Sequence, residues 1–226
     1  MSSAGVDPAA TTRPSPARLA EAVLDAARAF SSATLHEASG KRGALPCAIK
    51  PVDPRFRVCG PALTVQSPGG DNLWLHRALD VAEPGHVLVV DVSGTYEHGY
   101  WGEIMSTAAR ALKLGGLVIN GCVRDGQLLP EVGFPVFCRG LCIRGTGKDF
   151  AARGFINYPL LLGEVIVRPG DLIVGDGDGV VCLNAETVQE VVTAAARREA
   201  EEAAILGRLI RGERTLDVYG WRQRRQ

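Results

Sequence analysis

The chain has 226 residues, and its 25 basic and 25 acidic side chains cancel to a formal net charge of zero. Balanced charge argues against a protein that is drawn to nucleic acid or to a membrane surface, so the expected partner is a small molecule. The length suits one buried domain, and no interior stretch has the composition of a domain linker.

No targeting or membrane-spanning segment is evident. The N-terminus lacks the basic and apolar regions of a secretory signal, and no run of about eighteen apolar residues occurs. We therefore expect a soluble, cytoplasmic protein. The cysteines form no CxxC pair and are expected to be reduced and buried. They are Cys47, Cys59, Cys122, Cys138, Cys142 and Cys182.

The N-terminal region is expected to be unstructured at first and then helical. Residues 1–14 are small, polar and proline-containing, which is typical of a segment without fixed structure. Ser15 followed by Pro16 has the pattern of an N-cap with proline at the first helical position, which predicts a helix over residues 15–30.

The next part of the chain alternates predicted helices and strands. A short helix is expected at residues 34–39 and another at 71–81. Residues 58–66 have the pattern of a strand, and the proline within it requires a bend or an edge position. Residues 86–92 are almost all apolar, as in a strand that is covered on both faces.

One amphipathic helix and one buried strand occupy the middle of the chain. After a glycine-rich loop over residues 93–100, apolar residues recur with a period of about 3.6 from Trp101 onward, which predicts a helix. Gly115 and Gly116 end this helix, and residues 117–120 have the composition of a buried strand.

The last third of the chain is predicted to consist of hairpins and one long helix. The GDGDG run at residues 175–179 lacks the ligand spacing of a calcium loop and predicts a hairpin turn. A helix over residues 185–211 should close a mixed α/β domain with layered sheets, which we place at residues 15–211, with a tail at 212–226. Short strands are expected at residues 135–138, 163–167, 172–174 and 180–183.

Glu103, Arg124 and Asp125 are the main candidate site residues. The predicted helix and strand lie between Glu103 and Arg124, so a helix N-terminus and the carboxyl end of a strand should meet there. Free amides after Gly102 suit a carboxylate or phosphate, Arg124 suits the same anion, and Asp125 suits Mg²⁺ or Mn²⁺. On spacing alone, the simpler interpretation is that Arg124 and Asp125 cap a turn and that Glu103 favours the helix dipole.

Several other polar segments have weaker functional patterns. Residues 68–72 either cap the following helix or line a pocket. The four histidines lack metal-ligand spacing, although His98 stands in the glycine-rich loop. Lys113 and Lys148 are expected on a solvated helix face and in a polar loop, which does not suit a Schiff-base amine.

The C-terminal helix carries a row of charged residues between Arg197 and Glu202. The simpler interpretation is a solvated face with ion pairs along the helix. A sharper alternative is that one of its glutamates reaches the pocket of a neighbouring subunit.

Three blocks of sequence, found in the same order, resemble the RraA-like family. They are PGGDNLWLHRALDVAEPGHVLVVD at residues 68–91, GEIMSTAARALKLGGLVINGCVRDG at 102–126 and VRPGDLIVGDGDGVVCL at 167–183. The resemblance extends over residues 33–210. The family includes 4-hydroxy-4-methyl-2-oxoglutarate aldolases, which also cleave 4-carboxy-4-hydroxy-2-oxoadipate, and the regulators of ribonuclease activity. The resemblance implies a layered α/β/β/α sandwich of the swivelling β/β/α type.

The resemblance also implies site residues and a reaction. The backbone amides after Gly102, at Glu103, Ile104 and Met105, would bind a pyruvyl carboxylate, and Arg124 would bind a substrate oxygen. Asp125 would hold Mg²⁺ or Mn²⁺, and Glu103 and Arg124 would act in catalysis. The implied enzyme is a lyase, a class II pyruvate aldolase that also decarboxylates oxaloacetate. Glu103 is longer than the aspartate that is frequent in the family.

Assembly and alternatives follow from the same resemblance. Family members are similar in forming homotrimers or dimers of trimers with sites at subunit interfaces. Regulators of ribonuclease activity typically lack the metal-binding aspartate, so Asp125 favours the enzyme over a non-catalytic regulatory protein. An enzyme acting on a different oxo or hydroxy acid is a third possibility, since a fold does not determine a substrate.

Overall fold

The computed structural model describes residues 7–223. Its α-helices are α1 (Glu21–Arg28), α2 (Ser32–Ala38), α3 (Leu73–Val81), α4 (Glu103–Ala111), α5 (Leu129–Val132), α6 (Val188–Ile210) and α7 (Thr215–Val218), and its 3-10 helices are η1 (Pro8–Thr11) and η2 (Trp221–Gln223). Its strands are β1 (Lys50–Pro51), β2 (Val58–Gln66), β3 (Val87–Asp91), β4 (Gly116–Asn120), β5 (Cys122–Val123), β6 (Val136–Cys138), β7 (Gly140–Leu141), β8 (Phe155–Ile156), β9 (Leu160–Leu162), β10 (Val165–Val167), β11 (Leu172–Asp176) and β12 (Gly179–Leu183).

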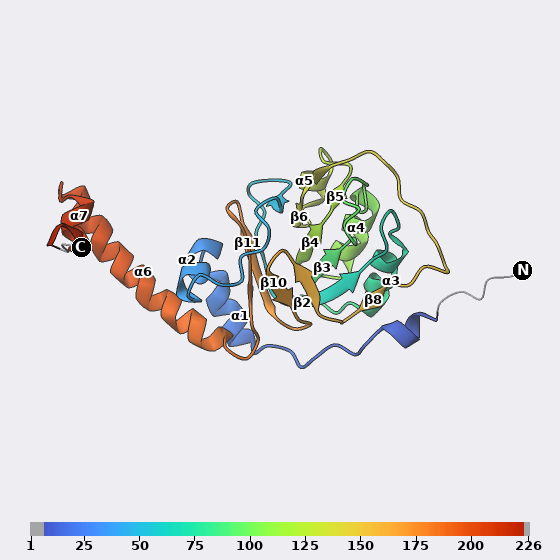
Figure 1. The fold of residues 1–226 in the computed structure, drawn as a ribbon, viewed down its shortest axis with the longest axis horizontal. Coiled ribbons are helices and arrows are strands. Elements are labelled where there is room, and N and C mark those ends of the chain that lie inside the picture. The colour runs from blue at the N-terminus through green and yellow to red at the C-terminus, as the bar shows by residue number, and fades with distance from the viewer. Residues whose placement is uncertain (1–6, 224–226) are drawn as a thin grey trace, which may run out of the picture.

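One mixed sheet organises the fold, with the strand order β1-β6-β4-β3-β2-β11-β12 (Figure 1). Strands β2, β3, β4 and β6 run parallel to one another, as expected where helices connect them. β11 pairs antiparallel with both β2 and β12. β2 therefore joins a parallel half of the sheet to an antiparallel half.

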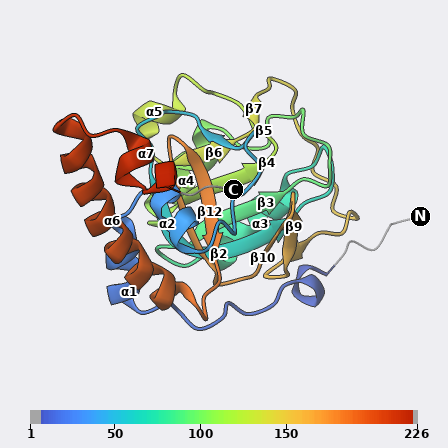
Figure 2. The same cartoon turned by 60° about the vertical axis from the view of Figure 1, so that its left-hand side comes forward.

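The sheet curls until its two halves face each other (Figure 2). A core cluster between them combines Val89, Val118 and Phe137 of the parallel half with Ile173 and Val180 of the antiparallel half. The two ends of the sheet also meet, because the Lys50 ammonium donates a hydrogen bond to the Asp178 carbonyl. The sheet is thus nearly closed.

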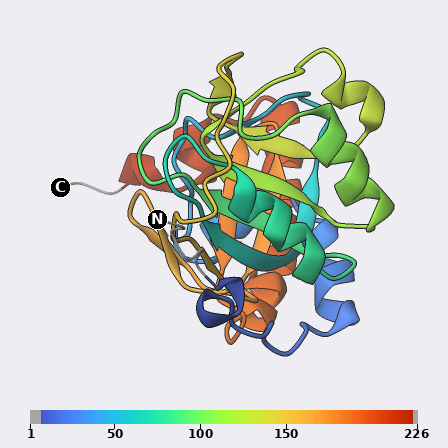
Figure 3. The same ribbon diagram turned by 90° about the vertical axis from the view of Figure 1, so that its right-hand side faces the viewer.

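Helices cover the outer faces of both halves. α3 and α4 pack on the parallel half through Trp74, Leu75 and Met105, and Figure 3 shows these two helices in front of the sheet. α1, α2 and α6 pack on β11 and β12. The predicted α/β/β/α layering is confirmed, and its two β layers are parts of one continuous sheet.

The prediction for the N-terminal region needs correction. Residues 15–20 are not helical, and α1 begins only at Glu21. The Ser15 hydroxyl lies 3.4 Å from Asn157 Nδ2 instead of capping a helix, and the Arg13 amide donates to the Ile156 carbonyl. Residues 7–14, expected to lack structure, contain η1 and a bridge from Thr12 to Ile156, whereas residues 1–6 lie outside the described range.

Strand β2 has the predicted bounds, but its proline does not place it at an edge. β2 lies between β3 and β11. Pro61 pairs with Leu172 of β11, while the ladder with β3 starts at Ala62. Pro61 therefore lies before the part of β2 that pairs with β3, so its missing N–H removes no hydrogen bond from that ladder. A central strand can tolerate proline at such a position.

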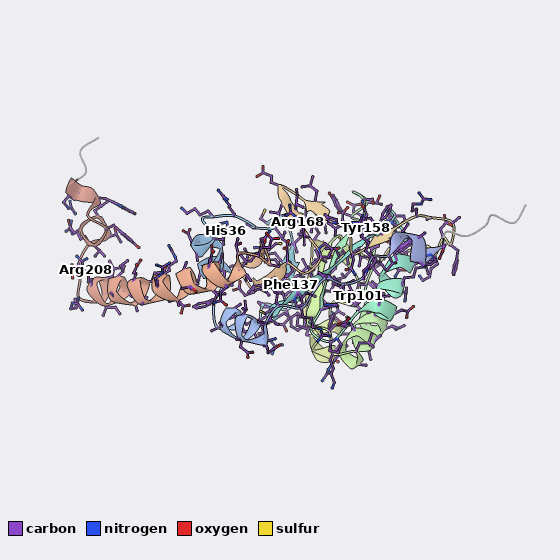
Figure 4. All side chains as sticks on the ribbon, turned by 90° about the horizontal axis from the view of Figure 1, so that it is seen from below. His36, Trp101, Phe137, Tyr158, Arg168 and Arg208 are labelled. Carbon is purple, nitrogen blue, oxygen red and sulfur yellow. The ribbon has the colours of Figure 1, made fainter. Side chains whose placement is uncertain are left out.

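The C-terminal part is mostly as predicted. β11 and β12 form a hairpin in which Asp176 pairs with Gly179, so the GDGDG run is a turn. α6 starts at Val188, near the predicted residue 185, and its buried residues Val188, Val192 and Ala195 all lie in its first half. The second half leaves the body together with α7, so that Arg208 lies far from Phe137 (Figures 1 and 4).

All six cysteines are free, as expected, but only Cys138 and Cys182 are buried. Burial raises the pKa of the Cys138 thiol to about 11, so it stays protonated near neutral pH. Cys47 is exposed, which corrects the expectation that all six are buried. No helix within residues 7–223 combines the length and apolar character needed to cross a membrane.

Candidate active site

A cavity of about 270 Å³ lies where α4 begins and where the chain leaves β5. Gly102, Ile104 and Met105 of the α4 terminus line it, together with Arg124 and Asp125 from the turn after β5. The buried side chain of Trp101, labelled in Figure 4, forms part of the wall. Five of the six predicted site residues thus line one cavity, whereas the sixth, Glu103, is exposed beside it.

The turn that carries Arg124 and Asp125 is held against the start of α4. The Arg124 amide donates to the Trp101 carbonyl at 2.8 Å, and Asp125 adopts a left-handed backbone with φ of 60°. Aspartate tolerates that conformation better than most residues. Its carbonyl accepts hydrogen bonds from the amides of Leu128 and Leu129, which fixes the turn.

The Asp125 carboxylate caps α4. Its Oδ2 accepts a hydrogen bond from the Glu103 amide at 3.0 Å and lies 3.8 Å from Arg124 Nε. No hydrogen bond to Oδ1 occurs within the described residues, and the side chain is 34% exposed. The Asp125 carboxylate thus caps a helix, whereas the simpler interpretation was that it caps a turn, and one carboxylate oxygen accepts no hydrogen bond.

Gly99 and Gly102 allow the two backbone segments to approach closely. A Cβ atom at Gly102 would lie 2.2 Å from Asp125 Oδ2, and one at Gly99 would lie 2.9 Å from Arg124 Cβ. Both distances are shorter than real side chains permit. These two positions therefore exclude any residue larger than glycine while Arg124 and Asp125 stay in place.

The N-terminus of α4 presents free amides to the cavity. The Glu103 amide is taken by Asp125, but the amides of Ile104 and Met105 have no acceptor among residues 7–223. Two free N–H groups and the positive end of the helix suit a carboxylate. The Glu103 side chain forms no hydrogen bond or ion pair within the described chain, so its predicted role with water stays a prediction.

The segment at residues 68–72 serves both of the predicted purposes. Asp71 Oδ1 accepts a hydrogen bond from the Leu73 amide at 2.8 Å, so Asp71 caps α3. Asn72 lines the cavity and donates from Nδ2 to the Tyr100 carbonyl. His98 lies beside this region, with its ring centroid 5.8 Å from that of Tyr100, but it is not part of the cavity wall.

Sequence reasoning missed part of the wall. His76, Thr146 and Lys148 line the cavity, although Lys148 was expected only in a polar loop. Burial, and secondarily the charge of Lys148, lowers the pKa of His76, so its imidazole is neutral near pH 7. Lys148 comes from a loop whose position depends on distant contacts, and no local pattern marks it.

The donor set fits a divalent metal ion that is held by a single carboxylate. No group of three or more His, Cys, Asp or Glu side chains with metal-binding geometry occurs within residues 7–223. Asp125 Oδ1 is nevertheless an open, hard oxygen donor. Mg²⁺ is commonly bound by one or two carboxylates, with water and substrate completing the coordination.

Comparisons with known proteins agree with this fold. A family description, "RraA-like: Aldolase/RraA", matches residues 19–182. A protein of Halalkalibacterium halodurans named "Putative 4-hydroxy-4-methyl-2-oxoglutarate aldolase" is 38% identical over 160 residues, covering 71% of this chain and 75% of that protein.

Two solved structures are similar over most of the chain. An uncharacterized protein from Pseudomonas syringae superposes with a TM-score of 0.80 at 29% identity, covering 90% of this chain and 95% of that one. Streptomyces coelicolor RraAS2, described as an unusual member of the RNase ES inhibitor RraA family, superposes with a TM-score of 0.73 at 29% identity. The match covers 100% of that chain and 84% of this chain.

Proposed function

Since the chain belongs to the RraA-like family, we propose that it is a lyase, a divalent-metal-dependent class II pyruvate aldolase. Its substrates would be 4-hydroxy-2-oxo acids such as 4-hydroxy-4-methyl-2-oxoglutarate or 4-carboxy-4-hydroxy-2-oxoadipate. The observation that carries the proposal is the meeting of the α4 N-terminus, Arg124 and Asp125 at one cavity. Relatives named as aldolases support the same reaction class.

The predicted site residues each have a task in such a reaction. The free amides of Ile104 and Met105 bind the 1-carboxylate, and Arg124 donates to the developing negative oxygen at C2. Asp125 would hold Mg²⁺ or Mn²⁺, and the ion would supply Lewis-acid charge that stabilises the developing enolate. Glu103 orients a water that removes the proton from the C4 hydroxyl, which breaks the C3–C4 bond.

The same cavity would decarboxylate oxaloacetate. Loss of the 4-carboxylate as CO₂ leaves the same pyruvate enolate as aldol cleavage does, so the groups that stabilise negative charge at C2 serve both reactions. A water then protonates C3 to give pyruvate.

A coupled assay of pyruvate release tests the proposal. The substrates are oxaloacetate and 4-hydroxy-4-methyl-2-oxoglutarate, with Mg²⁺, with Mn²⁺ and with EDTA. We expect metal-dependent turnover, and we expect Asp125→Ala to lower kcat/KM by at least about a hundredfold. The exposed Asp178→Ala, on the distant hairpin turn, is the control. Turnover that survives both EDTA and Asp125→Ala would contradict the proposal.

The second candidate is a non-catalytic regulatory protein of the ribonuclease-inhibitor type. It is favoured by the structural similarity to Streptomyces coelicolor RraAS2. In that case no 2-oxo acid would be turned over with either metal, and a macromolecular partner would be retained in a pull-down. The open Asp125 carboxylate favours the enzyme.

We also propose that the chain assembles as a homotrimer or a dimer of trimers. Three large apolar side chains near the cavity are strongly exposed in the single chain, namely Ile104 at 77%, Leu141 at 63% and Ile143 at 97%. Exposed apolar groups that lie this close together are typical of an interface. Light scattering coupled to size-exclusion chromatography should give three or six times the 24.0 kDa mass of one chain.

A further inference from the structure

A chain of three polar side chains lies outside the cavity, at the carboxyl ends of neighbouring parallel strands. Asn120 Nδ2 donates a hydrogen bond to Asp91 Oδ1 at 3.0 Å, and Arg139 Nε donates one to Asn120 Oδ1 at 2.7 Å. Asp91 and Asn120 are paired in the ladder between β3 and β4, and Arg139 directly follows β6. Asn120 is 5% exposed, and none of the three residues lines the cavity. The proposed reaction gives this chain of side chains no role.

Asp91 also shapes the loop that leads from β3 to α4. Its Oδ2 accepts a hydrogen bond from the Ser93 amide at 3.1 Å. Ser93 has a φ of 53° and Gly94 a φ of 78°, so the backbone turns sharply there. Because a carboxylate only accepts hydrogen bonds, the NH₂ end of Asn120 must face Asp91, and the amide oxygen of Asn120 is left facing Arg139.

Arg139 connects this chain of side chains to the middle of the same loop. Its guanidinium carbon lies 4.1 Å from the centroid of the Tyr96 ring, a distance at which a cation and an aromatic face attract each other. The Arg139 amide donates to the Gly121 carbonyl at 2.9 Å, so the backbone of Arg139 is fixed to the segment that follows β4. Thr95 and Glu97 are exposed, whereas Tyr96 is partly buried against the core. The Tyr96 side chain therefore attaches this part of the loop to the body.

The position of Tyr96 matters because its loop is hydrogen-bonded along β5. The Cys122 amide donates to the Tyr96 carbonyl at 2.9 Å, and the Cys122 carbonyl accepts from the Tyr100 amide at 3.1 Å. Further along, the Arg124 amide donates to the Trp101 carbonyl at 2.8 Å. Because α4 starts just after this loop, the row of three bonds sets how far the free amides of α4 lie from the Arg124 side chain.

We propose that Arg139 is a positioning residue for the α4 cavity, which acts through Asn120 and Tyr96 without touching the ligand. By holding Tyr96, it keeps the loop aligned with β5 and so keeps the α4 amides opposite Arg124. Its effect on turnover rests on the proposed function, because that function places the reacting groups in this cavity. Its effect on the loop does not depend on any reaction.

Amide hydrogen exchange, followed by NMR, tests whether Arg139 restrains the loop. The exchange rates of the Tyr100, Cys122 and Arg124 amides report how often the row of hydrogen bonds opens. We expect Arg139→Met to raise these three rates about tenfold. The Ala62 amide of β2, which is hydrogen-bonded in the antiparallel half of the sheet, should exchange at an unchanged rate.

Further variants separate the parts of this contact. Arg139→Lys keeps the charge and a donor for Asn120 but lacks the planar guanidinium, so it should restore slow exchange only in part. Tyr96→Phe keeps the ring face and should behave as the wild type. Tyr96→Leu should have the effect of Arg139→Met, and the double variant should be no worse than either single variant. Arg13→Met is the matched control, since Arg13 lies over the Tyr158 ring at 3.9 Å and neither residue lines the cavity.

Two results of the exchange experiment would overturn the assignment. Unchanged rates in Arg139→Met would show that the loop is not restrained there, and a rise of equal size at Ala62 would show only a loss of global stability. Additive effects of Arg139→Met and Tyr96→Leu would mean that Arg139 does not act through Tyr96. If Arg139→Met does not fold, Arg139→Lys and Tyr96→Leu provide the same comparison.

The pyruvate assay separates this inference from the proposed function. Arg139→Met should lower kcat about tenfold and change KM by less than about threefold, because displaced reacting groups affect the transition state most, and Arg139→Lys should recover part of the loss. If the wild type releases no pyruvate but the exchange rates respond as expected, the aldolase proposal fails and the restraint of the loop by Arg139 stands. If Arg139→Met releases pyruvate at the wild-type rate, the aldolase proposal stands and the assignment of Arg139 fails.

Discussion

At the scale of single residues, the two oxygens of the Asp125 carboxylate differ in their contacts. Oδ2 caps α4 through the Glu103 amide, while Oδ1 accepts no hydrogen bond within the described residues. Binding a metal ion through Oδ1 therefore need not break the cap. Gly102 makes this arrangement possible, because a side chain there would occupy the position of Oδ2.

Gly102→Ala should lower activity much more than stability. The new Cβ would lie 2.2 Å from Asp125 Oδ2, so the carboxylate must rotate away and lose its hydrogen bond to the Glu103 amide. We expect the free energy of unfolding to fall by about 1 kcal/mol, the typical value of a helix cap, as measured by urea denaturation. Pyruvate release should fall at least about tenfold, because the proposed metal ligand has moved.

Gly145→Ala is the matched control for Gly102→Ala. Gly145 lines the same cavity, and an added Cβ would meet no atom within 4 Å. Its activity should stay close to that of the wild type. If Gly102→Ala also kept full activity, the close approach of Asp125 would have no catalytic importance.

Lys148→Met should raise the pKa of His76. Burial and then the charge of Lys148 hold that pKa below its ordinary value of 6.5. Removing the charge leaves burial, which lowers the pKa, and the negative charges of Asp80 and Asp71, which raise it, so the pKa of His76 should rise toward 6.5. An NMR titration of the His76 ring measures this shift, with Lys113→Met as the control. An unchanged pKa would mean that Lys148 does not lie near His76 in solution.

At the scale of elements, one buried carboxylate joins α2 to the hairpin of β11 and β12. Asp176 Oδ2 accepts from the Ser32 amide at 2.8 Å, and Oδ1 accepts from the Ser32 hydroxyl at 2.7 Å and the Asp178 amide at 3.0 Å. Asp176 thus stabilises both the first turn of α2 and the hairpin turn. The outer helical layer is attached to the sheet at this point.

Asp176→Ala should lower the free energy of unfolding by about 2 kcal/mol, because three hydrogen-bond donors, two of them on the buried Ser32, lose their acceptor. Urea denaturation at pH 7 measures the loss. Asp178→Ala, two residues away and exposed, should change it little. Equal stability of both variants would show that the Asp176 contacts are energetically neutral.

The effect of Asp176 should depend on pH. Burial raises the pKa of Asp176, but the hydrogen bonds from Ser32 and Asp178 outweigh burial and hold the pKa below its ordinary value of 3.8. A depressed folded pKa stabilises the protein above the unfolded pKa, and this contribution is lost as the pH falls through the folded value. The difference between wild type and Asp176→Ala should therefore be constant above about pH 5 and shrink below about pH 4.

At the scale of the whole molecule, the curled sheet creates a core between its own two halves. Phe137 of β6 is fully buried there, and its ring lies next to β11. A Cβ atom added at Gly175 of β11 would lie only 3.1 Å from Phe137 Cε1. Glycine at 175 leaves room for the ring where the two halves meet. The parallel half that carries the cavity is thereby fastened to the antiparallel half that carries α6.

Phe137→Ala should destabilise the protein by about 3–5 kcal/mol, because it leaves a cavity between the two halves of the sheet. Phe150→Ala is the matched control, since Phe150 is 64% exposed and its loss removes little packing. Urea denaturation followed by circular dichroism compares them. Similar midpoints for the two variants would contradict the described core.

The predicted elements show which features have local signals. β2 was predicted with its observed bounds, and α3, β3, α4 and β4 were each predicted within a few residues. All five have a clear hydrophobic period or a clear start and stop residue. The helix predicted at residues 15–30 had an equally clear start signal in Ser15 and Pro16, but it begins only at Glu21. Contacts of Arg13 with Ile156 and of Ser15 with Asn157 keep the chain before it extended. The short strands β5, β7, β8 and β9 have no such signal.

The sequence by itself determined that Gly102 starts a helix, because helix hydrogen bonds join near neighbours in the chain. It also determined that Arg124 and Asp125 follow a buried strand, because a short apolar run marks such a strand locally. Only the tertiary structure decided that the sheet closes on itself and that Lys148 lies in the cavity. Lys148 is placed by the isolated bridge between Gly147 and Asp71 and by the hydrogen bond from the Gly147 amide to the Gly70 carbonyl. A contact between segments so far apart leaves no periodic pattern in either of them, because their burial depends on the whole fold.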